Sequence, residues 1–302
     1  MTAFELFRCD KESGPTWQNT GHAERATEKW REAKMLDLVG TRAVKMSSFS
    51  RLAAGAVALA IAWSGTAARA QGPVLPVPAS DQQQIAAHLG AGVVGAALPS
   101  ERILDALSYF PLQEKTLTFQ VTSGRNAGNT QNLNLKKARR PGGAVVWRFS
   151  FAPSLAGFIN PTAGGDLIMS AVSDVDEGVI AVTTPSSPFV VAGMQPGESR
   201  SFSQTVSVNY LDDPTRRDWG GSLSATYTYV GTYQVTVPAG TFNAILIRFA
   251  YRGKVGPADV VYTAWYFFAR DVGLVAMVNL EDVSAFWIYH VDTTIGKVLA
   301  VK

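Results

Sequence analysis

The strongest constraint on the fold is the pattern of residues 116–302, where short runs of β-branched and aromatic residues alternate with Gly, Pro, Asn and Asp. Runs of this kind, bounded by turn-forming residues, are typical of strands. No long stretch with helical periodicity separates them, so consecutive strands are expected to pair antiparallel. The pattern predicts strands at 116–123, 129–137, 144–151, 167–172, 178–184, 200–210, 223–237, 242–252, 258–269, 273–280, 284–292 and 295–301.

Several of the later strands are apolar on both faces. Along one of them, Trp265 and Phe267 point to one face while Tyr266 and Phe268 point to the other. A strand with two apolar faces is covered on both, as in a barrel with an outer cover or in two stacked sheets. The sequence therefore predicts a mainly β fold: an antiparallel curved sheet or barrel, with short N-terminal helices covering it.

The covering helices are expected immediately before the strands. Ser80 and Asp81 can cap a helix over residues 82–89, and a second helix is expected over residues 102–108. Residues 71–79 are rich in proline and predict an extended linker. The predicted order is thus a linker at 71–79, short helices at 80–108, the second of them capped by Ser100 and Glu101, and an antiparallel β-domain at 109–302.

Residues 46–70 have the three parts of a secretory signal peptide. Arg51 supplies the positive first part, residues 52–63 form an apolar run, and residues 68–70 form a small-x-small cleavage motif. The apolar run is about a dozen residues, short of the roughly 20 that a spanning helix needs. Cleavage after Ala70 and export to the periplasm or the medium are therefore expected. Residues 1–45 do not suit a position upstream of a signal peptide, and we interpret them as a non-native extension from a misassigned start, with translation beginning at Met46.

Charge and cysteine content exclude several classes of partner. Residues 1–70 hold 10 of the 27 Lys and Arg residues and 7 of the 24 Asp and Glu residues, which leaves 17 of each in the exported part. Nucleic acid is not expected as a partner, because binding phosphate backbones needs an excess of basic residues. Cys9 precedes the signal, so the exported part can form neither a disulfide nor a lipid anchor on cysteine. A soluble product without a membrane span is expected, and its oligomeric state stays open.

Two motifs resemble a group of bacterial secreted β-rich domains of unknown function. The first is G-x-x-x-V-x-V-P-A-G-T-F from Gly231 to Phe242, and the second is a W-Y strand followed by V-G-L-V, from Trp265 to Val275. The likeness extends over most of residues 108–302 and implies a β-rich envelope protein with no catalytic residues to transfer. The chain departs from the group after its Y-F-P-L opening, where it has Glu114, Lys115 and Phe119 in a region that usually carries Gly, Trp and Tyr.

The hairpin within the first motif can be predicted from its turn residues. Pro238, Ala239, Gly240, Thr241 and Phe242 lie between two strand runs. Pro238 presets φ for the first corner, and Gly240 can adopt the left-handed conformation that closes a three-residue hairpin with a bulge. This hairpin is a structural hallmark and not a catalytic signal.

No cofactor, metal or catalytic group is predicted. Residues 90–95 match G-x-G-x-x-G but lack the strand, helix and distant acid of a dinucleotide site. The acidic turn at 173–178 fails the spacing of a calcium loop. The exported part has two histidines, His88 and His290, which are far apart in sequence, and it has no G-x-S-x-G or S-x-x-K motif.

A candidate ligand pocket can be assembled from aromatic and basic residues of the late strands. Tyr227 and Tyr229 share a face of one strand, and Arg248 and Arg252 share a face of the next. If both faces point into a barrel, they form apolar walls with polar anchors, and His290 on a terminal strand could join them. The alternative is that these residues serve cross-strand packing and outward-facing charge.

Three functions remain open from the sequence. The preferred one is a non-enzymatic exported envelope protein that binds a small apolar or amphipathic ligand, or an envelope component, in a sheet or barrel cavity. The second is a structural or interaction module whose barrel is filled by its own side chains. The third is a hydrolase of envelope glycans or lipids that uses carboxylates brought together by folding, since such pairs leave no local motif.

Overall fold

The computed structural model of the chain describes residues 72–141, 143–285 and 289–302. The predicted extension at 1–45 and signal peptide at 46–70 lie outside these residues. The described helices and strands are α2 (Ala79–Leu89), β1 (Val94–Leu98), α3 (Ala106–Tyr109), β2 (Lys115–Ser123), β3 (Thr130–Arg139), β4 (Val145–Ser150), β5 (Leu155–Pro161), β6 (Leu167–Asp174), β7 (Val179–Val190), β8 (Ser199–Tyr210), β9 (Arg217–Val237), β10 (Gly240–Val255), β11 (Ala258–Ala269), β12 (Gly273–Ala285) and β13 (Tyr289–Val301).

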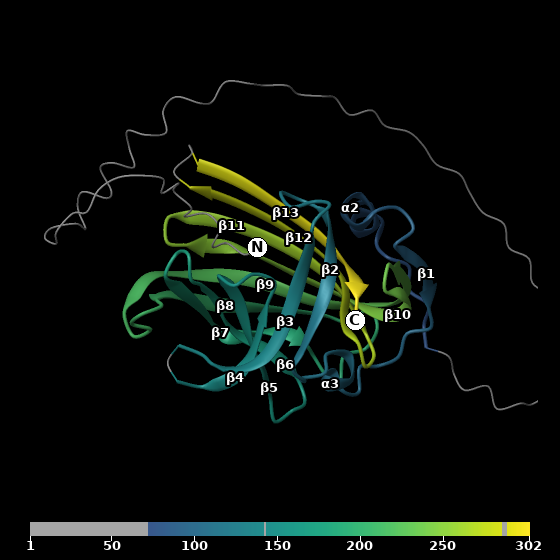
Figure 1. Ribbon diagram of the computed structural model, residues 1–302, viewed down its shortest axis with the longest axis horizontal. Coiled ribbons are helices and arrows are strands. Elements are labelled where there is room, and N and C mark those ends of the chain that lie inside the picture. The colour runs from purple at the N-terminus through teal and green to yellow at the C-terminus, as the bar shows by residue number, and fades with distance from the viewer. Residues whose placement is uncertain (1–71, 142, 286–288) are drawn as a thin grey trace, which may run out of the picture. The chain divides into compact units, whose positions relative to one another are not determined.

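The strands close into a ring. Hydrogen bonding runs in the order β9-β10-β11-β12-β13-β2-β3-β4-β5-β6-β7-β8, and β8 pairs again with β9, so the described strands β2–β13 form a closed barrel of twelve. Every neighbouring pair is antiparallel. The predicted antiparallel curved sheet or barrel is confirmed as a barrel. In Figure 1 the long strands β9–β13 run side by side, and β2 and β3 cross them steeply.

Strand β9 closes the ring because it is long enough to pair with different partners at its two ends. Its first half, from Arg217 to Thr228, pairs with β8, and its last residues, from Thr232 to Val235, pair with β1. Along the other edge, β10 follows β9 from Val237 back to Gly221. Strand β1 thus lies outside the ring as an extra strand on β9.

The two helices differ from their predicted forms. Helix α2 forms, but it begins at Ala79 after Pro78 with no side-chain cap, so the predicted cap by Ser80 and Asp81 is wrong. Helix α3 is a single turn capped by Asp105, and the helix predicted over 102–108 with its cap at Ser100 and Glu101 is wrong. The reason is tertiary: the backbone of Ile103 exchanges hydrogen bonds with Gly193 and Met194, which keeps this segment extended.

Two strands are missed by the sequence prediction, and one predicted strand is wrong. Strands β1 and β5 are missed because their sequences, VGAAL and LAGFINP, contain few of the β-branched and aromatic residues that mark strands. The strand predicted at 284–292 is wrong, because Ser284 on β12 and His290 on β13 pair with each other across two antiparallel strands. Residues 285–291 contain no Gly, Pro, Asn or Asp, so the local pattern gives no sign that two strands share this stretch.

The late strands are covered on both faces, as their composition predicts. Trp265 and Phe267 on the outer face of β11 are 3% and 0% exposed. Helix α2 packs on β12, β13 and β2, and its Ile85 and Leu89 are buried in the same core. The fit is tight at Gly296, where an added Cβ would collide with the His88 carbonyl oxygen. Helix α2 therefore covers only part of the barrel wall, over β12, β13 and β2, and α3 adds one turn, so the predicted covering by helices is confirmed in part.

The proline-rich segment at 72–78 docks on the barrel. Val74 forms an isolated β-bridge with Pro99, and the Ser100 amide donates to the Pro73 carbonyl. The Tyr233 hydroxyl donates to the Leu75 carbonyl at 2.8 Å. The segment is extended, and these contacts fasten it against β9.

Candidate functional site

The register of β9 and β10 places the predicted pocket residues on opposite faces. Tyr227 pairs with Phe249 and Tyr229 with Ile247, which belong to the inner core, whereas Arg248 pairs with Thr228 on the other face. Cross-strand partners share a face and neighbours along a strand alternate. The tyrosines therefore point into the barrel and the arginines point out, so the expectation that the two pairs share a face is wrong.

A bulge in β9 causes this separation. From the turn to Gly231 the pairing follows the Val237–Gly240 register, which would continue by placing Tyr229 opposite Arg248. The register shifts between Leu246 and Ile247, so that β9 carries one extra residue there. A one-residue shift moves every later side chain to the other face. Gly231 is the sequence sign of this bulge, since a glycine inside a strand often marks one.

Tyr227 and Tyr229 have structural partners. The Tyr227 hydroxyl donates to the Phe189 carbonyl at 3.3 Å, and the Tyr229 hydroxyl donates to the Glu101 carbonyl at 2.9 Å. Burial raises the pKa of Tyr227 far above its usual value and raises the pKa of Tyr229 to about 12. These two phenols are neutral hydrogen-bond donors that join β9 to the end of β7 and to the segment before α3.

The basic candidates lie on the outer face. Arg248 faces α2, where its Nε is 3.4 Å from the Asp81 carboxylate, and Arg252 is exposed. His290 is also exposed and lies between the carboxylates of Asp282 and Asp292. The five predicted pocket residues therefore do not line one site.

The predicted hairpin joins β9 and β10, with a shorter connection than expected. Val237 pairs with Gly240, which leaves a two-residue connection, Pro238 and Ala239, instead of three residues. Gly240 has φ of 128°, and Thr241 and Phe242 continue into β10. The Ala239 amide donates to the Leu299 carbonyl at 3.2 Å, so the turn is also held by β13.

A group of polar side chains lies on the inner face of β10–β12, and we call it the interior tyrosine cluster: Tyr251, Tyr262, Tyr266, Asn279 and Glu281. The rings of Tyr251 and Tyr262 stack with centroids 4.7 Å apart, and the hydroxyls of Tyr262 and Tyr266 are 2.8 Å apart. Glu281 pairs with Tyr262 across β11 and β12, and Asn279 pairs with the Ala264 position. Glu281 and Asn279 are each 6% exposed. The cluster thus places a carboxylate, an amide and three phenols together inside the barrel.

The environment of the cluster keeps its phenols neutral. Burial raises the pKa of Tyr266 to about 12, and the Glu281 carboxylate acts in the same direction. Burial, followed by the neighbouring Tyr266 and Tyr251, raises the pKa of Tyr262 well above its usual value. Since desolvation disfavours the charged phenolate, these tyrosines act as hydrogen-bonding groups and not as bases near neutral pH.

Some inward-facing polar atoms have no hydrogen-bond partner among the described residues. They are Oδ1 of Asn279 and Oε1 of Gln204 and Gln131. Gln204 pairs with the inner residue Leu223, and Gln131 pairs with the inner residue Phe119. Native proteins rarely leave buried polar atoms unpaired, and such atoms call for an explanation. All of these atoms are acceptors, which is the pattern that a donor-rich molecule would complement.

The rest of the interior is lined with aromatic rings. Phe189 lies 4.9 Å from Phe110 and 5.3 Å from Phe268 between ring centroids, in edge-to-face contacts. Tyr251 and Tyr266 point into the barrel, but neither side chain is fully buried. Each therefore keeps some surface that a water-sized molecule can reach. The same is true of Trp147, Phe149 and Phe151, which continue the inner face on β4 and just beyond it. The interior is therefore aromatic and retains accessible surface.

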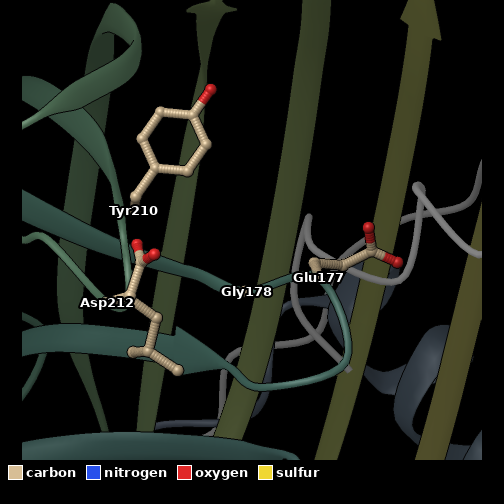
Figure 2. Close-up of a pocket in the computed structure, with 5 residues that line it drawn as sticks. Glu177, Gly178, Tyr210 and Asp212 are labelled. Carbon is tan, nitrogen blue, oxygen red and sulfur yellow. The ribbon is translucent and has the colours of Figure 1, made fainter. Parts of the chain in front are cut away.

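A hollow of about 550 Å³ lies on the outside, between the β6–β7 and β8–β9 connections. It is lined by Glu177, Gly178, Tyr210, Leu211 and Asp212, and Figure 2 shows Tyr210 and Asp212 on one side with Glu177 on the other. The Tyr210 hydroxyl already donates to Asp218 at 3.0 Å. On the wall of the hollow, the Leu211 amide donates to the Gly178 carbonyl. This bond joins the two segments that line the hollow.

Among the described residues, three carboxylates are buried, and each lies in a different part of the structure. Asp81 is on α2 outside the barrel and pairs with Arg248. Asp174 accepts the backbone amides of Asp176 and Glu177 and so caps its own turn. Glu281 lies among tyrosines. These three groups belong to different surroundings, whereas glycosidase chemistry needs two carboxyl groups facing one bond.

Comparison with models of known protein families gives no match, and comparison with curated proteins gives none. Among solved structures, a protein from Bacteroides fragilis provisionally described as exported, with a YmcC-like fold, superposes with a TM-score of 0.34 at 14% identity and covers 64% of this chain and 97% of its own. A protein from Parabacteroides distasonis provisionally described as a lipoprotein gives a TM-score of 0.31 at 12% identity, with coverage of 64% and 97%. Superpositions this loose carry no argument about this chain.

Within the described residues, neither helix has the length and hydrophobicity needed to cross a bilayer.

Proposed function

We propose that this chain is a non-enzymatic exported envelope protein whose barrel interior binds an amphipathic molecule. The observation that carries the proposal is the Asn279 amide oxygen, which is buried and has no hydrogen-bond partner among the described residues. Asn279 faces the barrel interior opposite Ala264, the position between Tyr262 and Tyr266 on β11. Burying an amide without a partner costs about 1–3 kcal/mol. A bound molecule that donates to this oxygen would offset the cost.

The chemistry of the interior defines the kind of molecule. The apolar part would lie among Phe110, Phe189 and Phe268, whose rings form one connected group. The polar part would lie at the interior tyrosine cluster, where the unpaired Asn279 oxygen can accept a hydrogen bond. Small-molecule sites combine apolar walls with a few convergent polar groups. A headgroup rich in hydroxyl or amine donors, on an alkyl chain, fits this arrangement.

Export rests on the sequence. Residues 46–70 combine a positive start, a short apolar run and a small-x-small cleavage motif. The resemblance to secreted β-rich domains supports the same compartment. We expect the protein recovered from the cell envelope to begin at Gln71. Intact-mass measurement of that protein tests this expectation, and a full-length chain recovered from the cytosol would refute it.

Ligand binding can be tested with two probes of different polarity. N-phenyl-1-naphthylamine reports apolar interiors by fluorescence, and dodecyl maltoside offers an alkyl chain with a hydroxyl-rich head. The purified protein is expected to bind the first saturably, and the second is expected to displace it. Absence of saturable fluorescence would refute the proposal.

A variant of the cluster separates specific binding from surface adsorption. Asn279→Leu keeps nearly the same volume and removes the unpaired amide. It is expected to weaken dodecyl maltoside binding about fivefold, which is the loss of roughly 1 kcal/mol of hydrogen bonding. Asn209→Leu is the control, because Asn209 pairs with Ile180 on the outer face of the barrel wall. Equal affinities in both variants would place the probes outside the cluster.

The alternative of a barrel filled by its own side chains is favoured by the edge-to-face packing of the interior rings. It predicts no probe binding. Under that alternative, Asn279→Leu raises the free energy of unfolding and changes nothing else, because replacing an unsatisfied polar group by an apolar one removes a cost. The same measurements therefore decide between the two functions.

A further inference from the structure

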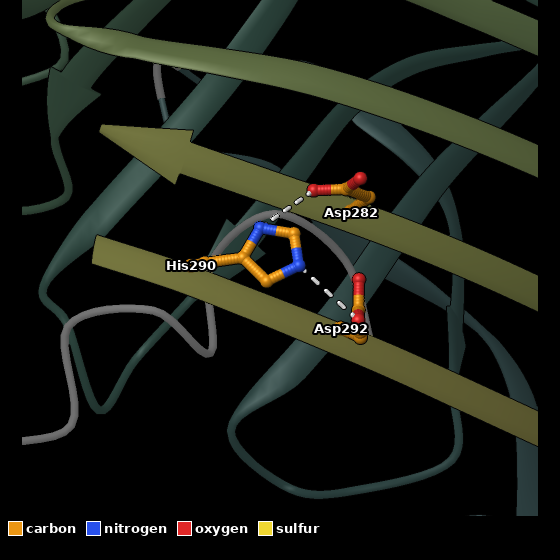
Figure 3. Close-up of side chains that lie close together, drawn as sticks. All are labelled: Asp282, His290 and Asp292. Carbon is orange, nitrogen blue, oxygen red and sulfur yellow. Dashed lines mark hydrogen bonds and ion pairs between the residues drawn. The ribbon is translucent and has the colours of Figure 1, made fainter. Parts of the chain in front are cut away.

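The outer face of the β12–β13 pair carries a compact group of metal-ligating side chains. Asp282 pairs directly with Asp292 across the two strands, and His290 lies two residues from Asp292 on the same face. His290 Nδ1 is 3.3 Å from Asp282 Oδ1, and His290 Nε2 is 3.2 Å from Asp292 Oδ2. Figure 3 shows the imidazole between the two carboxylates.

Two opposed carboxylates need a positive neighbour. Like charges placed directly opposite in an antiparallel pair are destabilising. Arg252 lies in the same row, but it reaches Asp282 only across Val261, two strands or about 10 Å away. The side chains are also open to solvent, with 48% of Asp282, 70% of Asp292 and 58% of His290 exposed. A cation can therefore approach this group from water without entering the protein.

We propose that Asp282, His290 and Asp292 bind a divalent transition-metal ion, with Zn²⁺ as the best match. One nitrogen and one oxygen from each carboxylate give three protein ligands, and water would complete a tetrahedral shell. The imidazole makes the set better suited to Zn²⁺ than to Ca²⁺ or Mg²⁺, which prefer oxygen ligands alone. The site is independent of the interior tyrosine cluster, because Glu281 points inward and Asp282 outward.

The geometry needs only side-chain rotation to close on an ion. The candidate ligand atoms lie within 4.8 Å of one another. Ligands about 2.1 Å from a tetrahedral ion are roughly 3.4 Å apart, so the carboxylates must move inward by about 1 Å. The half-exposed side chains are free to rotate, whereas the backbone positions are fixed by the ladder from Ala276–Val298 to Ala285–Tyr289. A fixed backbone that carries side chains able to rotate is compatible with binding of an ion.

Isothermal titration of the purified protein with zinc chloride tests the proposal. We expect one equivalent of Zn²⁺ to bind with micromolar affinity and both Asp282→Asn and His290→Gln to weaken it at least tenfold. The matched control is His88→Gln, which removes the other histidine of the predicted exported chain and should leave the affinity unchanged.

A second measurement guards against misfolded variants. Co²⁺ substituted for Zn²⁺ should give a visible absorption band, and this band should disappear in His290→Gln while the far-ultraviolet circular dichroism stays that of the original chain. Absence of zinc binding, or affinity lost in the histidine control instead of in the Asp282 and His290 variants, would overturn the proposal.

Discussion

At the scale of single residues, one step along a strand decides whether a side chain meets the interior or the solvent. Glu281 and Asp282 are neighbours in sequence, yet the first joins the interior tyrosine cluster and the second lies beside His290 outside. The sequence shows the alternation within each strand but not the phase between strands. That phase depends on the bulge in β9, which is why Tyr227 and Arg248 could not be placed correctly in advance.

The interior tyrosine cluster left a partial signal in the sequence. Within β12, the inward positions are Met277, Asn279, Glu281 and Val283. An amide and a carboxylate at consecutive inward positions of an otherwise apolar strand are unusual, because buried polar groups need partners. The sequence alone, however, does not show that these two side chains point into the barrel, because this follows from the pairing of β12 with β11. The strand itself was predicted, and its polar face was not.

The Tyr262 hydroxyl is expected to contribute to stability through its bond to Tyr266. Tyr262→Phe leaves the Tyr266 hydroxyl without its 2.8 Å partner and should lower the free energy of unfolding by about 1–2 kcal/mol, measured by urea denaturation. Tyr210→Phe is the control, since its bond to Asp218 joins half-buried residues at the end of β8 and the start of β9, and its loss should cost no more than about 0.5 kcal/mol. Equal effects would mean that the interior bond contributes nothing beyond a surface one.

At the scale of elements, the predictions succeeded where composition and structure agree locally. Strand β11 occupies the predicted 258–269, because its β-branched and aromatic residues carry the signal on both faces. The sequence prediction missed strand β5 and made helix α3 too long, and the two errors have opposite causes. β5 is held by pairing with β4 and β6 despite its Gly, Asn and Pro, and the helical pattern at 102–105 is overridden by the backbone pairing of Ile103 with residues 193 and 194.

Helix α2 is expected to depend on its buried ion pair. Asp81 is 6% exposed and Arg248 is one third exposed, so Asp81→Asn should lower the free energy of unfolding by about 1–2 kcal/mol, less than for a fully buried pair. Hydrogen exchange of the α2 amides should also become faster. Asp259→Asn, which breaks the exposed pair with Lys254, is the control and should stay within about 0.5 kcal/mol. Unchanged exchange in α2 would show that the pair does not hold the helix.

Gly296 is expected to be essential for the close packing of α2 against β13. A Cβ at this position would collide with the His88 carbonyl oxygen and with the Thr122 hydroxyl that donates to it, so Gly296→Ala should cost about 1–3 kcal/mol. Gly164→Ala is the matched control, because its added Cβ would meet only an ordinary contact with Thr162. Thermal unfolding compares the two variants, and equal midpoints would mean that α2 adjusts freely.

At the scale of the whole molecule, closing the barrel concentrates neutral phenols in places that water reaches poorly. Burial raises the pKa of Tyr229, Tyr233 and Tyr266 to about 12 and raises those of Tyr251 and Tyr262 well above their usual value. In the unfolded chain a tyrosine ionises near pH 10. The folded state thus keeps protons that the unfolded state releases once the pH exceeds about 10.

These tyrosines are therefore expected to lower the free energy of unfolding in alkali and to leave it unchanged in mild acid. The buried tyrosines contribute fully to the free energy of unfolding below about pH 10. This contribution falls as the pH rises toward 12, by roughly 1.4 kcal/mol per pH unit for each buried tyrosine. Urea denaturation at several pH values, followed together with tyrosinate absorbance, measures both sides of this linkage. The buried phenols should ionise only as the barrel unfolds, and Tyr266→Phe should make the fall shallower by the share of one tyrosine. Ionisation of all nine tyrosines near pH 10 in a chain that stays folded would contradict the account, because it would require phenolates to be tolerated inside the barrel.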